Sequence, residues 1–157
     1  MKLNHEENKT LQLEFCERCE LAENPADSKI SVTIQAKSVD THDENRDNHL
    51  RTNDFFDAET HPTWTFTSTA IRPRSASEWD VDGDLTIRGV TKQVTLDATL
   101  EGVVNDPYGL HRVGFSATTS IVRDDFGVSF NAALETGGVV VGKKVDIDLE
   151  VEATLQA

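Results

Sequence analysis

The residues best suited to chemistry lie in one polar stretch, Asn45 to Asp57. It places two arginines, an aspartate and a histidine within one or two helical turns, followed by two adjacent phenylalanines: Arg46, Asp47, His49, Arg51, Phe55 and Phe56. Guanidinium and imidazole groups suit a charged or polar head group, beside which the phenylalanines would line the mouth of an apolar cavity. The alternative is a short helical connection whose aromatic rings close the end of a barrel and whose charged groups pair with one another.

Three histidines, His42, His49 and His61, are close in sequence but lack the spacing of a metal-ligand motif. Solvated histidines are the simpler interpretation, and a three-histidine site formed in space is the alternative. The sequence also contains no GxSxG, no HExxH and no glycine-rich phosphate loop. We therefore expect neither a metal nor a cofactor.

Two further pairs of residues have both a chemical and a structural interpretation. Asp124 and Asp125 have the residue types of an acid/base pair, although adjacent acids before Gly127 are typical of a strand end. Cys16 and Cys19 form a CxxC, but the sequence offers no second ligand pair for zinc. It also lacks the βαβ unit of a thioredoxin-like redox motif. We interpret the acids as a strand end and the cysteines as incidental.

Acids outnumber bases by 28 to 15, which gives a formal charge of -13. Such a charge repels nucleic-acid phosphates and anionic membrane surfaces, so nucleic acid is not an expected partner. No run approaches the roughly 18 apolar residues of a membrane span. The first residues lack the apolar core of a secretory signal, which predicts a cytoplasmic location. The length of 157 residues favours a single domain.

Apolar and polar residues alternate in several short segments, which is typical of half-buried strands. These segments are 30–36, 62–69, 78–89, 91–102, 111–122 and 143–155. Turn-forming residues separate them, as at Arg88–Gly89. The pattern predicts an all-β antiparallel protein, either a sandwich or a barrel. Small inward residues such as Gly83 and Ala117 leave room for a ligand in a barrel, and they equally fit a packed sandwich.

Several unusual strings give the chain a family resemblance. They are SVDT at 38–41, NRDNHLRTNDFFD at 45–57, HPTWTF at 61–66, GDLTIRGVTK at 83–92, GF at 114–115 and RDDFG at 123–127. Together, and in this order, they resemble the YceI-like family of polyisoprenoid-binding proteins over residues 22–153. The longest strings are too specific for chance similarity.

The resemblance implies an all-β fold, an antiparallel lipocalin-like β-barrel with a short helical connection near residues 45–57. It also implies a non-catalytic carrier that holds a long isoprenoid lipid, such as a polyprenyl phosphate or a quinone, and that forms a homodimer. Residues 1–20 depart from the family pattern, so we place the barrel domain at 21–157, after an atypical segment. We expect a partly open barrel, incomplete at the N-terminus, or a gap filled by Leu11 to Glu20.

On this interpretation the inward-facing apolar residues form the cavity wall: Phe66, Leu85, Ile87, Leu96, Phe115, Ile121 and Val151. Three aromatic residues lie near an opening: Phe55, Phe56 and Phe126. The candidates for contacting a phosphate or quinone head group are Arg46, His49 and Arg51.

Alternatives to this site stay open. Arg46 has a structural interpretation as the partner of Asp47 or Asp54 in a salt bridge. The cluster of Arg46, Asp47 and His49 also suits an enzyme that acts on a small apolar substrate at a barrel mouth. A protein interaction module without a ligand is a third function.

Overall fold

The computed structural model of the protein describes residues 2–5, 9–12, 15–20, 27–105, 107, 111–132 and 141–154. Side chains are described within these ranges from residue 27 onward, apart from those at 111 and 154. In the same ranges, no helix has both the length and the apolar character needed to cross a membrane.

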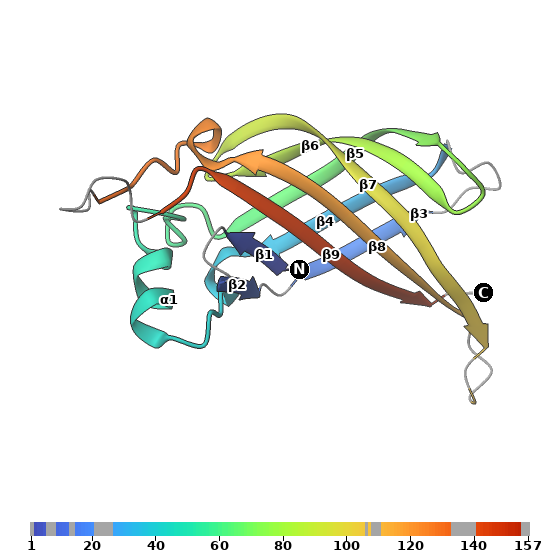
Figure 1. Ribbon diagram of the computed structural model, residues 1–157, viewed down its shortest axis with the longest axis horizontal. Coiled ribbons are helices and arrows are strands. Elements are labelled where there is room, and N and C mark those ends of the chain that lie inside the picture. The colour runs from blue at the N-terminus through green and yellow to red at the C-terminus, as the bar shows by residue number, and fades with distance from the viewer. Residues whose placement is uncertain are drawn as a thin grey trace.

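Nine strands in the described ranges form one antiparallel sheet. They are β1 (Lys2–His5), β2 (Lys9–Gln12), β3 (Phe15–Glu20), β4 (Lys29–Gln35), β5 (Thr63–Pro73), β6 (Glu78–Ile87), β7 (Val90–Asn105), β8 (His111–Val122) and β9 (Lys144–Thr154). The sheet curls strongly, and α1 (Glu44–Arg51) lies at one end of it (Figure 1). Two 3-10 helices follow β4 and β8 at that end, η2 (Ala36–Ser38) and η3 (Arg123–Phe126). The predicted all-β, lipocalin-like fold is confirmed.

The sheet is open. Its strand order is β2-β1-β9-β8-β7-β6-β5-β4-β3, so β2 and β3 are its two edges. A closed barrel needs hydrogen bonds between the two edges, and the described strands do not make them. The prediction of a partly open barrel is therefore confirmed. The segment Leu11 to Glu20 contributes to both edges, because Leu11 pairs with β1 and Phe15–Glu20 pairs with β4.

A two-residue turn sets the register of the central strands. Arg88 and Gly89 connect β6 to β7 with φ angles of 51° and 74°. Two successive positive φ angles define the type I′ turn, whose twist matches that of antiparallel strands. Ile87 and Val90 therefore pair directly, and this register directs Leu85 toward the inner face, where it is buried.

The short helical connection predicted near residues 45–57 contains α1, which begins at Glu44 and ends at Arg51. Asp43 caps its N-terminus by accepting a hydrogen bond from the backbone N–H of Arg46 at 3.1 Å. The helix ends at Arg51 because Thr52 is extended, and the backbone N–H and hydroxyl of Thr52 both donate to the carbonyl of His49. The following turns place the two phenylalanines of this segment against the end of the sheet.

Gly83 allows Phe66 to pack closely inside the curl. A Cβ atom at Gly83 would lie 2.3 Å from Cζ of Phe66 and 2.7 Å from the carbonyl oxygen of Thr67. The space expected beside this small inward-facing residue is therefore filled by the Phe66 ring.

We expect Gly83→Ala to lower the free energy of unfolding by about 1–3 kcal/mol, because the added methyl group overpacks the Phe66 ring. Urea denaturation followed by circular dichroism measures this loss. Gly102→Ala is the matched control, because a Cβ atom there meets nothing within 4 Å, and we expect its effect to stay within about 0.5 kcal/mol. Equal destabilisation by the two variants would contradict the close-packing explanation.

Candidate functional site

Aromatic side chains close the end of the curled sheet beside α1. Phe55, Phe56 and Phe126 are 6%, 8% and 2% exposed. Phe56 packs edge-on against Trp64, with ring centroids 4.7 Å apart. The indole N–H of Trp64 is buried and has no acceptor among the described residues. This end of the interior is therefore apolar, and the three phenylalanines form a plug across it.

Arg46 and Arg51 join α1 to the segment that precedes it. Arg46 donates from Nε to Thr41 Oγ1 at 2.7 Å and from a terminal nitrogen to Thr41 O at 2.8 Å. Arg51 donates to the carbonyls of Lys37 and Val39 at 2.9 and 2.7 Å. Both guanidinium groups are thus engaged with neighbouring backbone, which holds α1 in place.

Asp47 lies in the same network, on the buried side of α1. Its Oδ1 atom accepts from the hydroxyl of Thr41 at 2.6 Å and from the backbone N–H of Thr41 at 2.9 Å. The Thr41 hydroxyl therefore connects Arg46 to Asp47, in place of the direct salt bridge that was the structural alternative. This carboxylate is 7% exposed and fixes the turn before the helix.

His49 belongs to a different group of contacts. Its Nε2 atom lies 3.0 Å from Oδ2 of Asp54. Its ring packs edge-on against Phe55 and Phe130, with centroids 5.1 Å apart in each case. Sequence reasoning missed Phe130, although its position shortly after the RDDFG string was a usable signal. The structure therefore separates His49 from the Arg46–Thr41–Asp47 network.

A second missed residue is Arg123, which is 6% exposed. Its guanidinium donates to the carbonyl oxygens of Gly142, Val128 and Val141 at 2.7, 2.6 and 3.2 Å. The contacts with Gly142 and Val141 join η3 to the residues that precede β9. The neighbouring Asp124 accepts from Lys143 at 2.8 Å, and this hydrogen bond holds the pKa of the Asp124 carboxyl below its usual value.

The predicted wall residues on the inner face form two groups, one buried and one half-buried. The buried group, on β5, β6 and β7, is 4–8% exposed: Phe66, Leu85, Ile87 and Leu96. The half-buried group lies on β8 and β9: Phe115, Ile121 and Val151. Phe115 and Val151 pair directly across these two strands. Solvent thus reaches apolar side chains of β8 and β9 that face the interior.

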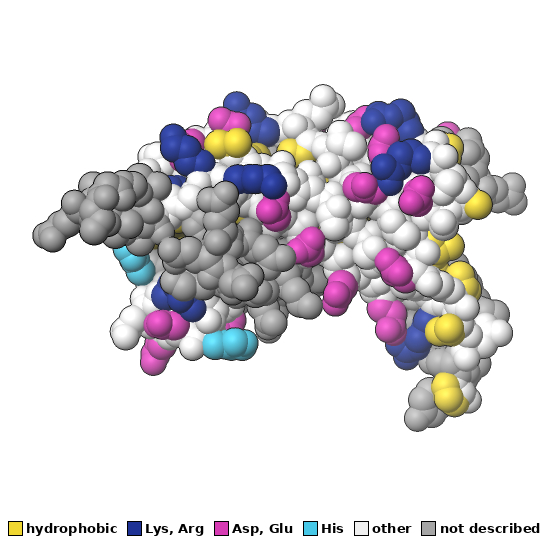
Figure 2. Space-filling view, viewed as in Figure 1, with side chains coloured by type: hydrophobic (Ala, Val, Ile, Leu, Met, Phe, Trp, Pro, Cys, Tyr) yellow, Lys and Arg dark blue, Asp and Glu magenta, His cyan; other side chains and the backbone are white. Residues whose placement is uncertain are grey.

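The outer face is charged rather than apolar. Ion pairs join Arg72 to Asp82 and Arg74 to Asp97, and the hydrogen bond to Asp97 raises the pKa of Arg74. Acidic and basic side chains are interspersed over it (Figure 2). Exposed ion pairs of this kind contribute little to stability. This face therefore resembles an ordinary solvated surface.

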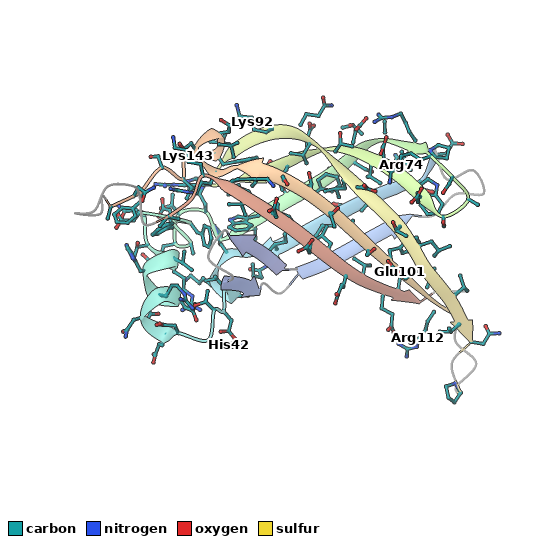
Figure 3. All side chains as sticks on the ribbon, viewed as in Figure 1. His42, Arg74, Lys92, Glu101, Arg112 and Lys143 are labelled. Carbon is teal, nitrogen blue, oxygen red and sulfur yellow. The ribbon has the colours of Figure 1, made fainter. Side chains whose placement is uncertain are left out.

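A hollow of about 560 Å³ lies around Gly114, lined by residues of β7, β8 and β9. Its lining combines the apolar Phe115 and Val151 with the polar Glu101, Ser116, Glu150 and Glu152. The Ser116 hydroxyl donates to Glu101 at 2.5 Å. Figure 3 labels Glu101 in this region. The hollow therefore brings three carboxylates beside two apolar residues of the predicted wall. Within the described ranges no three metal-ligating side chains come together.

The curled antiparallel sheet, apolar inside, charged outside and plugged at one end beside a short helix, places the protein in the class of lipocalin-like barrels. The family model "YceI-like domain" matches residues 7–153. The chain therefore belongs to the YceI-like domain family.

Individual relatives agree with this assignment. The chain is 42% identical over 128 residues to the UPF0312 protein SERP2314 of Staphylococcus epidermidis, covering 81% of this chain and 72% of that protein. It superimposes on the crystal structure of Burkholderia cenocepacia BcnA with a TM-score of 0.85 and 25% identity, covering 98% and 94% of the two chains. A polyisoprenoid binding domain from Saccharophagus degradans shares the fold, with a TM-score of 0.59, 15% identity and coverage of 96% and 95%.

Proposed function

We propose that the protein is a non-catalytic carrier that holds the chain of an isoprenoid lipid against the inner face of its sheet. The observation that carries this proposal is the half-exposed apolar wall of β8 and β9, where Phe115, Ile121 and Val151 face the interior without being buried. Apolar side chains left partly in contact with water gain free energy when an apolar ligand covers them. Membership of the YceI-like family, and the name of the Saccharophagus domain, support an isoprenoid as that ligand.

Burial of only a few isoprene units is enough to bind the lipid chain. Each unit has about five carbons, and burial contributes about 3–4 kcal/mol per unit at roughly 0.8 kcal/mol per CH₂ group. The gross sum for a long chain exceeds the tightest affinities known, so the cost of ordering the chain cancels much of it. The length of accessible wall therefore decides which chains fit.

The head group is proposed to stay away from the plugged end. A charged group is strongly destabilised in an apolar interior unless it is paired, and at this end even the indole N–H of Trp64 lacks an acceptor among the described residues. Arg46 and Arg51 already donate to backbone oxygens. Contact of Arg46, His49 or Arg51 with a polyprenyl phosphate or quinone head stays a prediction, as does the homodimer.

The geometry also supports binding without catalysis. The enzyme alternative needed Arg46, Asp47 and His49 to act on one substrate. Asp47 is instead buried against Thr41, whereas His49 pairs with Asp54 beside Phe55. The three side chains thus serve two separate sets of contacts.

Organic extraction of the purified protein, followed by mass spectrometry of the extract, tests the carrier function. We expect one isoprenoid lipid in a stoichiometric amount, because the accessible wall retains its ligand through purification. Protein that has been stripped and then incubated with a quinone or a polyprenyl phosphate provides a second measurement. Folded protein that yields an empty extract and takes up neither lipid contradicts the proposal.

A further inference from the structure

One side of β9 is covered over only part of its length. β8 pairs with β9 from Lys144 to Thr154, whereas β1 pairs with it only from Asp146 to Asp148. β9 runs on well past β1 (Figure 1). Among the strands that the structure describes, residues 149–154 therefore have a neighbour on the β8 side alone. A strand edge of this kind presents backbone groups with which another extended chain can pair.

The burial of the inward-facing residues of β9 falls where β1 ends. Ile147 lies opposite Leu3 of β1 and is 6% exposed. Leu149, Val151 and Ala153 follow on the same face of β9, and all three are only half-buried. β8 continues beside all of them, so the loss of burial coincides with the loss of a strand on the other side. A further strand in line with β1 would cover their exposed edge.

The register of β1 indicates which residue types suit this edge. Lys2 is opposite Asp148, and Leu3 is opposite Ile147. β1 thus places a basic residue opposite an acidic one, and an apolar residue opposite an apolar one. The same alternation continues on β9, with acids at 150 and 152 and apolar residues at 149, 151 and 153. A strand that matches this edge therefore alternates basic and apolar residues.

The hollow around Gly114 supports a basic partner. Its lining includes Glu150 and Glu152 of β9 and Glu101 of β7, and Arg112 pairs with one of these three carboxylates, that of Glu152 (Figure 3). The surface is therefore acidic and attracts lysine or arginine side chains. Its volume of about 560 Å³ leaves room for such long side chains beside the strand edge.

A second copy of the chain fits the same edge poorly. Every register that aligns the apolar residues of two antiparallel copies of residues 149–154 also places their acids opposite each other. Like charges directly opposite each other destabilise a strand pair. The charge of -13 on each copy adds to this repulsion. Charge complementarity therefore favours a different chain as the occupant.

We propose that residues 149–154 of β9 bind an extended segment of a partner protein that alternates basic and apolar residues. The segment lies antiparallel to β9, in line with β1, with its basic residues opposite the two glutamates of this edge. Backbone hydrogen bonds provide affinity, and the alternate side chains provide specificity. The inference does not depend on the carrier function, because the segment covers the edge of β9 whereas the proposed lipid covers its inner face.

Fluorescence anisotropy with the full chain and a labelled peptide of alternating lysine and valine tests the inference. We expect this peptide to bind about tenfold more tightly than one of the same composition with its lysines and valines in separate blocks. Glu150→Lys/Glu152→Lys should bind it about tenfold more weakly than the wild type and should prefer a peptide of alternating glutamate and valine. Glu59→Lys/Asp84→Lys makes the same change of charge at exposed acids outside β9 and should bind as the wild type does.

Hydrogen exchange locates the bound peptide on the wild type without any substitution. Backbone amides within residues 149–154 should exchange more slowly when the alternating peptide is bound, because a new strand covers them. Binding without this protection, or equal binding of the alternating and block peptides, overturns the inference in favour of unspecific charge attraction. A wild type that binds neither peptide also overturns it, whereas lipid recovered from the same protein would leave the carrier function standing. A dimer in light scattering that is lost in Glu150→Lys/Glu152→Lys overturns it in favour of a second copy.

Discussion

Phe115→Arg is expected to remove bound lipid from the protein while the strands stay folded. Phe115 is half-buried on the inner face, opposite Val151 on one side and Leu100 on the other. A guanidinium group at this position places a charge on the apolar wall, where a covering isoprenoid chain would leave it desolvated and unpaired. Lipid recovered by organic extraction should fall by about tenfold or more, with an unchanged β-sheet circular-dichroism spectrum.

Thr118→Arg is the matched control on the same strand. Thr118 is exposed on the outer face and pairs with Asp97 and Asp148, so an arginine there finds acidic neighbours in water. We expect this variant to retain lipid as the wild type does. Unfolding of Phe115→Arg would instead identify Phe115 as a core residue. Full lipid retention in a folded Phe115→Arg protein would exclude this part of the sheet as the ligand wall.

Arg123→Met should be the most destabilising of the substitutions considered. Three backbone carbonyls, those of Gly142, Val128 and Val141, accept hydrogen bonds from this buried guanidinium. Methionine fills a similar volume but removes all three of these hydrogen bonds. The Val141 carbonyl keeps its hydrogen bond from Nδ2 of Asn131 at 2.6 Å, whereas a buried acceptor left unsatisfied costs about 1–3 kcal/mol. We expect a loss of about 3–5 kcal/mol in the free energy of unfolding, measured by urea denaturation.

Arg112→Met provides the comparison for this loss. Arg112 pairs with Glu152 at the protein surface, and an exposed ion pair contributes about 0–1 kcal/mol. The contrast between the two variants isolates the effect of burial from that of removing a positive charge. Similar small losses for both arginines would show that the carbonyls near Arg123 find other donors.

The strands and their inward faces could be predicted from the sequence because the alternation is a local signal. In β6, for example, Val81, Leu85 and Ile87 are buried as the pattern predicts. The turn at Arg88–Gly89 and the helical connection were also readable, since each depends on residues within a few positions of one another. These local signals determined most of the fold.

The arrangement of the candidate site depends on contacts between distant residues, which a local pattern does not contain. The role of Arg123 arises only when η3 meets the loop before β9, 18–19 residues later in the chain. Similarly, the space at Gly83 is filled by Phe66 from the neighbouring strand. His49 and Phe130 are 81 positions apart, yet their rings touch. The residue types in the sequence identified most of the side chains of the candidate site. Only the fold shows which of these side chains are in contact.

Because the strand order is linear, hydrogen bonding between the strands does not fix the width of the interior. In a closed barrel, strand number and shear fix the radius, because every strand is hydrogen-bonded on both sides. Here β2 and β3 are separate edges, so the sheet can widen or tighten its curl without breaking a ladder between any two neighbouring strands. On the carrier function proposed above, we expect ligands of different thickness to be accommodated by a change in the curvature of the sheet.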